Sequence, residues 1–197
     1  MYRIYSALIE MISAAVFLIP LWCIYHKLRF HSWKRTMIYM VFGLYLTALL
    51  ALVGFPSVTS LKIDVAVNII PFVYMTADGI NACLNILLFI PFGFFLPIIW
   101  DIFRKIRNVA LMGWITTLFV ELSQIFTFRT TDIDDIITNT IGTIIGYMIA
   151  RWITNKFTKR ILLHSKICDF YMICGTVILV MFFFQPFISS LLWEIIR

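Results

Sequence analysis

The side chains best suited to chemistry lie in the middle of this 197-residue chain, at spacings that place several on shared helical faces. Gln124 follows Glu121 by three residues and Asn139 follows Asp135 by four, so each pair lies on one side of a helix. Carboxylates can act as general acid or base, and an arginine beside them can hold a phosphate or carboxylate. If the protein is an enzyme, we expect Glu121 to be the acid/base residue. The candidate binding residues are Asn85, Glu121, Gln124, Arg129, Asp132, Asp134, Asp135 and Asn139.

Structural roles compete with these chemical roles. Glu121 could form a buried salt bridge, for which Arg129 is the nearest cation in sequence. Thr131, with Asp134 three residues later, is typical of a helix N-cap with its capping-box partner. Acids at that position also suit the helix dipole. Asn85 could simply join two helices by a hydrogen bond.

The sequence predicts no bound metal and no cofactor. Asp132, Asp134 and Asp135 would suit magnesium or calcium, but a short run of acids is a weak signal for a metal. The four cysteines form no CxxC pair, which argues against a zinc site or a disulfide framework. No Walker-type glycine loop is present, which argues against nucleotide use.

The elements that must position these residues are membrane helices. The chain is 62% hydrophobic and only 13% charged, too apolar for a water-soluble core of this size. A bilayer requires about 20 apolar residues per spanning helix. We therefore predict an all-α polytopic membrane protein, a single transmembrane domain over 1–197 with about six spans. The predicted spans are 6–26, 37–56, 81–100, 109–127, 136–154 and 169–190.

The distribution of Lys and Arg predicts the orientation. Twelve of the sixteen cations fall in the connections 27–36, 101–108 and 151–168. The positive-inside rule then places these connections in the cytoplasm and both termini outside. The candidate residues consequently gather in the outer part of the bilayer, whereas all three histidines lie on the cytoplasmic side. Cations in short blocks between apolar segments indicate topology and not nucleic-acid binding.

Two further patterns concern packing. Between Leu61 and Ile69 apolar and polar residues alternate, which indicates an extended ribbon within the 57–80 connection. Open backbone cannot face lipid, so we expect this ribbon at the outer interface or folded over the bundle as a cap. An amphipathic surface loop is the alternative. Gly142, Gly146 and Ala150 recur every four residues, which predicts a close approach between two helices.

Several fragments carry a family resemblance. In order, they are Asn68-Ile-Ile-Pro71-Phe72, Asn85-Ile-Leu-Leu-Phe-Ile-Pro91-Phe92-Gly93-Phe, Glu121-Leu-Ser-Gln124 and Arg129-Thr-Thr-Asp132-Ile-Asp134-Asp135-Ile-Ile-Thr-Asn139-Thr-Ile-Gly142-Thr-Ile-Ile-Gly146. At these helix-sized separations the chain resembles the VanZ-like family of bacterial membrane proteins, with a core over about 68–150. The resemblance implies a multi-pass protein of the bacterial plasma membrane. It also implies a link to resistance against teicoplanin and related lipoglycopeptides, through reduced drug binding at the cell surface.

Three functions remain open on these observations. The first is a non-enzymatic envelope protein whose outward polar residues bind a lipid headgroup, a glycolipid or the drug. The second is an enzyme that modifies envelope lipids or teichoic-type polymers by carboxylate chemistry. The third is a transporter of lipid-linked precursors, which we rank last because the polar groups do not continue through the membrane. The expected partners are membrane lipids and a lipoglycopeptide or envelope glycolipid, with no nucleic acid.

Overall fold

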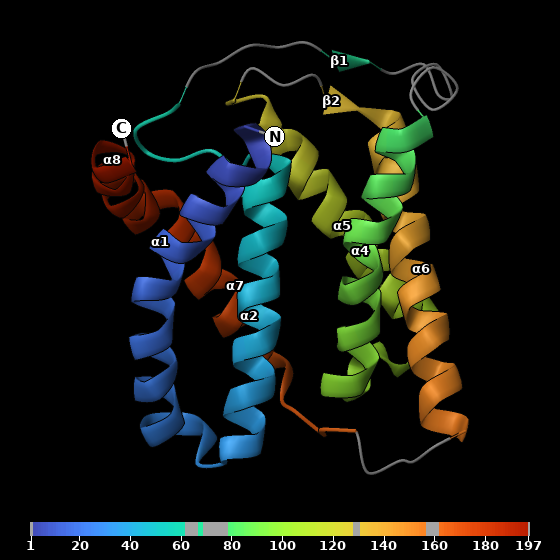
Figure 1. The fold of residues 1–197 in the computed structure, drawn as a ribbon. Helices are drawn as coiled ribbons and strands as arrows, with labels where there is room; N and C mark the ends of the chain where they lie inside the picture. Colours follow the sequence, from blue (N-terminus) through green and yellow to red (C-terminus); the bar gives the residue numbers. More distant parts are fainter. Residues whose placement is uncertain (1, 62–66, 69–78, 128–130, 157–161, 197) are drawn as a thin grey trace. The chain divides into compact units, whose positions relative to one another are not determined.

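The computed structural model describes residues 2–61, 67–68, 79–127, 131–156 and 162–196 (Figure 1). The described chain is almost entirely helical, which confirms the all-α membrane fold. Its longer helices are α1 (Tyr2–Tyr25), α2 (Trp33–Val53), α4 (Gly79–Ile99), α5 (Ile106–Gln124), α6 (Ile133–Lys156), α7 (Ile167–Leu179) and α8 (Gln185–Ile196). The shorter elements are η1 (His26–Phe30), β1 (Val67–Asn68), η2 (Asp101–Arg104), β2 (Thr131–Asp132) and η4 (Val180–Phe184).

Five helical stretches in the described residues are long and apolar enough to cross a membrane. They are Ile4–Phe30, Trp33–Val53, Gly79–Ile99, Ile133–Lys156 and Ile167–Ile195. The predicted span at 109–127 corresponds to α5, which is 19 residues long but carries several polar side chains and is not among the five. Large apolar side chains are exposed along these helices, as expected where lipid is the solvent.

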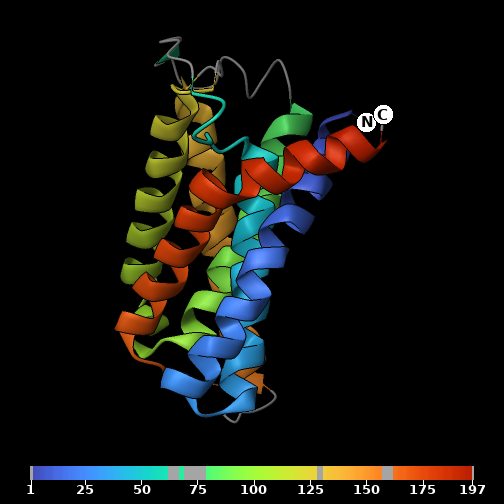
Figure 2. The same cartoon turned by 90° about the vertical axis from the view of Figure 1, so that its left-hand side faces the viewer.

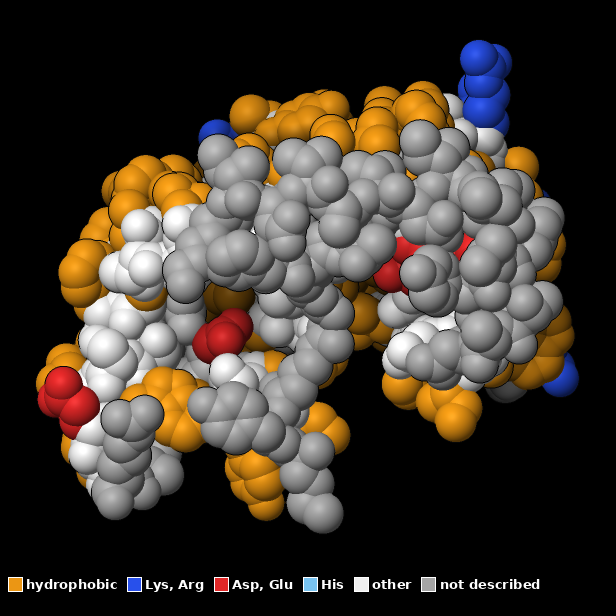
Figure 3. Space-filling model, turned by 90° about the horizontal axis from the view of Figure 1, so that it is seen from above, with side chains coloured by type: hydrophobic (Ala, Val, Ile, Leu, Met, Phe, Trp, Pro, Cys, Tyr) orange, Lys and Arg blue, Asp and Glu red, His pale blue; other side chains and the backbone are white. Residues whose placement is uncertain are grey.

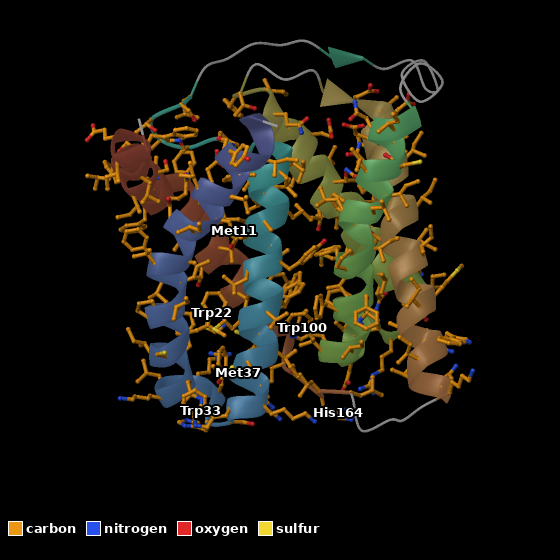
Figure 4. All side chains as sticks on the ribbon, in the orientation of Figure 1. Met11, Trp22, Trp33, Met37, Trp100 and His164 are labelled. Atoms are coloured by element: carbon orange, nitrogen blue, oxygen red, sulfur yellow. The ribbon has the colours of Figure 1, made fainter. Side chains whose placement is uncertain are left out.

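The chain divides into two compact units. Unit 1 comprises Met1–Lys62 and Phe170–Arg197, and unit 2 comprises Ile63–Asp169. In unit 1, α1 packs against α2, and the buried Trp22 lies between them (Figure 4). A Cβ atom on Gly43 would lie 2.5 Å from the Trp22 ring, so this glycine makes room for the indole.

The predicted span at 169–190 is interrupted in the structure. It consists of α7, the π-helical turn η4 and α8, and Figure 2 shows the chain changing direction between α7 and α8. Pro186 has no N–H to donate to the Phe182 carbonyl four residues earlier. The Val58 N–H donates to that carbonyl instead, at 3.0 Å. A missing helical hydrogen bond and its replacement from the loop after α2 explain the break.

In unit 2, α4 and α6 make the closest helix contact. A Cβ atom on Gly142 would lie 2.3 Å from the Ile86 carbonyl oxygen, and one on Gly146 would lie 2.0 Å from that of Ile90. The small-residue pattern on α6 therefore does mark a close approach, and α4 is the partner. Despite its internal prolines, α4 continues as one helix from Gly79 to Ile99.

Short backbone pairings occur at both ends of unit 2. At one end, β1 pairs in parallel with β2, with Val67 opposite Thr131 and Asn68 opposite Asp132. At the other end, the Leu163 N–H donates to the Ile98 carbonyl at 2.8 Å. Most of the predicted 57–80 ribbon lies outside the described residues; its described piece at 67–68 is extended and pairs with the segment just before α6.

Candidate functional site

Three helix ends and a strand pair form the candidate site at one end of unit 2. The start of α4, the end of α5 and the start of α6 meet there, beside β1 and β2 (Figure 1). Acidic side chains are visible among the segments at this face (Figure 3). We call the polar residues gathered at this end the polar cluster. Its described members are Asn85, Thr117, Glu121, Gln124, Asp132, Asp134, Asp135 and Asn139.

Glu121 is the most deeply buried carboxylate of the polar cluster. It lies near the end of α5 and is 1% exposed. Its Oε2 atom accepts a hydrogen bond from the backbone N–H of Asp132 at 3.0 Å. This bond connects α5 to the segment that begins α6. A buried carboxylate in a membrane helix is costly unless it is paired, and a backbone N–H is one such partner.

Asp132 caps α6. Its Oδ1 atom accepts the N–H of Asp134 at 3.0 Å, two residues into the helix, and Asp132 itself precedes the first helical residue Ile133. The cap predicted at Thr131 is therefore wrong by one residue, because Thr131 belongs to β2 and the helix begins later. A carboxylate at this position also interacts favourably with the helix dipole.

Asn85 and Asp135 join α4 to α6. The Asn85 Nδ2 atom donates to Asp135 Oδ1 at 2.6 Å, across 50 residues of sequence. This contact supports the structural role for Asn85 that the sequence left open. It also places Asp135 on the side of α6 that faces α4, beside the glycine contacts described above.

Removing this contact tests its contribution. We expect Asn85→Ala and Asp135→Ala each to destabilise the protein, and the double variant to cost less than the sum of the two. The coupling should be about 0.5–1.5 kcal/mol, as is usual for hydrogen bonds between membrane helices. A double-mutant cycle on reversible unfolding in detergent micelles measures it. Strict additivity would show that the two side chains do not interact.

Asn139 lies one turn beyond Asp135 on α6 and is 3% exposed. Its Nδ2 atom donates to Thr117 Oγ1 at 2.9 Å. Its Oδ1 atom is buried and has no hydrogen-bond partner among the described residues. The geometry thus leaves one acceptor that an N–H or O–H donor could satisfy. Thr117 was not predicted, although its position four residues before Glu121 places it on the same helical face.

Two of the remaining candidate residues, Gln124 and Asp134, are buried in the structure, and the third, Arg129, is not described. Gln124 is 4% exposed at the end of α5, and its carbonyl accepts the Thr127 N–H at 2.9 Å. Asp134 is 3% exposed within the first turn of α6. Arg129 lies outside the described residues, so its pairing with an acid remains a prediction. Across the described ranges, no three His, Cys, Asp or Glu side chains are placed to hold a metal ion.

The cations described in unit 2 lie at its opposite end. They occur where α4 ends, α5 begins and α6 ends, and Figure 4 places Trp100 and His164 at this same end. Two acids are described there: Asp101 pairs with Arg104 and, at 2.9 Å, with His164 Nδ1, and Asp169 in the first turn of α7 is 6% exposed. The basic residues that the structure describes in unit 2 therefore lie at one end, whereas Glu121, Asp132 and Asp134 are buried at the other. The basic residues are Arg104, Lys105, Arg107, Arg151, Lys156 and Lys166.

Fold and site together define a polytopic α-helical membrane protein with a buried polar cluster at one end of a tightly packed helical unit. The model of the VanZ/LLP1 family matches residues 38–154, and the chain belongs to this family. The match includes α2 as well as α4, α5 and α6, so it begins earlier than the core expected at 68–150. Comparisons with curated proteins and with solved structures gave no match.

Proposed function

We propose that this VanZ-family protein acts at the outer face of the bacterial plasma membrane and lowers the binding of teicoplanin-type drugs there. The polar cluster binds a lipid headgroup, an envelope glycolipid or the drug itself. Membership in the family supports the link to the cell envelope. The proposal includes the orientation, with both termini outside.

The observation that carries this proposal is that the basic residues described in unit 2 lie at the end opposite the polar cluster. Basic residues of membrane proteins are enriched on the cytoplasmic side. If the basic end of unit 2 is cytoplasmic, the polar cluster at the other end is external. Helices α4 and α6 are each long enough to separate the two ends by a membrane thickness.

Buried polar groups suit the cluster for binding. Glu121, Asp132 and Asn139 are each at most 9% exposed, and they come from α5, β2 and α6. Their carboxylate and amide oxygens can accept hydrogen bonds from the hydroxyl or amine groups of a glycan or a headgroup. Asn139 Oδ1, which has no partner among the described residues, is one such acceptor.

A charge-removing variant tests the function. Glu121→Gln keeps an oxygen that can accept the Asp132 N–H but removes the negative charge. Produced in a teicoplanin-sensitive bacterium, the wild-type protein should raise the inhibitory drug concentration and reduce the amount of labelled teicoplanin bound per cell. We expect Glu121→Gln to lose most of both effects at equal membrane abundance.

A second carboxylate serves as the matched control. Glu10→Gln in α1 removes a half-buried carboxylate of unit 1 that accepts a hydrogen bond from the Ser6 hydroxyl, and this variant should retain both effects. If wild-type protein changes neither resistance nor drug binding, the proposal is wrong. If resistance rises while bound drug is unchanged, and envelope lipids or polymers differ between wild type and Glu121→Gln, the protein is an enzyme.

A further inference from the structure

The C-terminal segment is long enough to cross a membrane before its last helix begins. Helix α7 has 13 residues and η4 has 5, giving 18 residues between Ile167 and Phe184. At about 1.5 Å per residue this stretch covers roughly 27 Å, close to the ~30 Å hydrocarbon core. Helix α8 has 12 residues and could cover only about 18 Å, too little for a second crossing.

Helix α8 changes direction after the break, and the structure holds that bend in place. Figure 2 shows α8 running away from the line of α7 toward the N-terminal end of α1. The Val58 N–H donates to the Phe182 carbonyl, to which Pro186 cannot donate. The ring of Phe17 in α1 packs against the ring of Phe184 in η4, with 5.3 Å between the ring centroids. Contacts from two other segments of unit 1 therefore fix the point where α8 departs.

The surface of α8 has one side packed against the protein and one exposed side, and the exposed side carries an apolar stripe and a polar stripe next to each other. One face packs toward α1 and includes the buried Gln185 and Pro186. The apolar stripe on the exposed side is formed by Phe187, Leu191 and Ile195, which recur every four residues and are 60%, 55% and 78% exposed.

The polar stripe carries Ser190 and Glu194 and runs along one edge of this exposed side, directly beside Phe187, which Glu194 follows by seven residues. The Ser190 hydroxyl donates to the Phe187 carbonyl at 2.8 Å, so it needs no outside partner. A short helix with an open apolar stripe beside an open polar stripe is suited to the boundary between lipid chains and headgroups.

We propose that α8 lies flat in the membrane interface as an amphipathic anchor, with a lipid surface as its partner. Phe187, Leu191 and Ile195 enter the upper acyl-chain region, and Ser190 and Glu194 face the headgroups and water. Apolar side chains are also exposed near the start of α1, against which α8 packs: Ile4 and Leu8 are 60% and 45% exposed. Because both termini of unit 1 lie at the same end, α8 sits where the α1 span meets the bilayer boundary (Figure 2).

This placement is measured by spin labels on single cysteines in the full-length chain. The native Cys23, Cys83, Cys168 and Cys174 are first replaced by serine, and Tm and monodispersity must match those of the wild type. Labels at 187, 190, 191, 194 and 195 are then compared in vesicles of phosphatidylcholine and phosphatidylglycerol. Collision with lipid-soluble oxygen and with a water-soluble nickel chelate reports the depth of each label.

We expect the labels at 187, 191 and 195 to favour oxygen several-fold over the nickel chelate, at one constant depth of about 5–10 Å. The labels at 190 and 194 should favour the chelate. A depth that increases steadily from 187 to 195 would mean that α8 crosses the membrane. Labels at 191 and 195 that are shielded from both reagents and broadened by a neighbouring label would mean that a second copy covers this face. Either result overturns the proposal.

Discussion

Gly93→Ala should destabilise the protein more than a methyl group added at any other helical glycine that the structure describes. A Cβ atom at position 93 would lie 1.8 Å from the carbonyl oxygen of Thr143, so α4 and α6 would have to move apart. The obstructing atom belongs to the backbone of a regular helix and cannot rotate away. We expect a loss of at least the ~1–3 kcal/mol typical of an overpacked core. Thermal unfolding in detergent should show Tm lowered by roughly 5–10 °C.

Gly175→Ala is the matched control for this substitution. Gly175 also lies inside a helix, α7, but a Cβ atom there would meet nothing within 4 Å. Alanine has the higher helix propensity, so we expect Tm to stay the same or to rise slightly. Equal stability of Gly93→Ala and the wild type would show that α4 and α6 are not packed at the spacing of this structure.

Asp132→Ala should loosen the start of α6 and disturb the polar cluster with it. The substitution removes the acceptor of the Asp134 N–H, a buried donor in the first turn of the helix. Loss of an N-cap costs about 0.5–2 kcal/mol, and a buried donor without a partner costs about 1–3 kcal/mol. We therefore expect a loss of about 1–3 kcal/mol. Hydrogen exchange should become faster at the backbone amides of Asp134 and Asp135.

The variant Asp132→Asn distinguishes the hydrogen bond that caps α6 from the negative charge of the Asp132 carboxylate. The asparagine side chain retains an Oδ1 acceptor, so most of the stability and most of the amide protection should return. If exchange at Asp134 is the same in Asp132→Ala and wild-type protein, the cap does not hold this turn. Recovery in Asp132→Asn without recovery of drug resistance would assign the Asp132 charge to binding.

Both Gly93 and Asp132 determine the geometry of the polar cluster, although they do so through different contacts. Gly93 sets the distance between α4 and α6, and this distance brings Asn85 within 2.6 Å of Asp135. Asp132 begins α6 and presents its backbone N–H to Glu121. Substitutions at Gly93 should therefore weaken function through the position of the cluster, although Gly93 itself is not one of its members.

Composition and periodicity alone predicted the helices and the membrane. The span expected at 136–154 lies within α6, and the one expected at 37–56 overlaps α2 over residues 37–53. These predictions succeed because a bilayer demands long apolar helices, and that demand is met locally in each stretch of sequence. The small-residue pattern at Gly142 and Gly146 is equally local, and it correctly marked a closely packed face.

Only the tertiary structure decided which groups meet. The pairing of Asn85 with Asp135 joins residues 50 positions apart, and β1 pairs with β2 although α4 and α5 lie between them in the described sequence. Helical spacing shows which residues share a face but not which helix that face will meet. The division of the last span into α7 and α8 likewise depends on Val58, a distant donor for the Phe182 carbonyl. Partner choice results from packing and hydrogen bonding summed over the whole unit, which no single window of sequence contains.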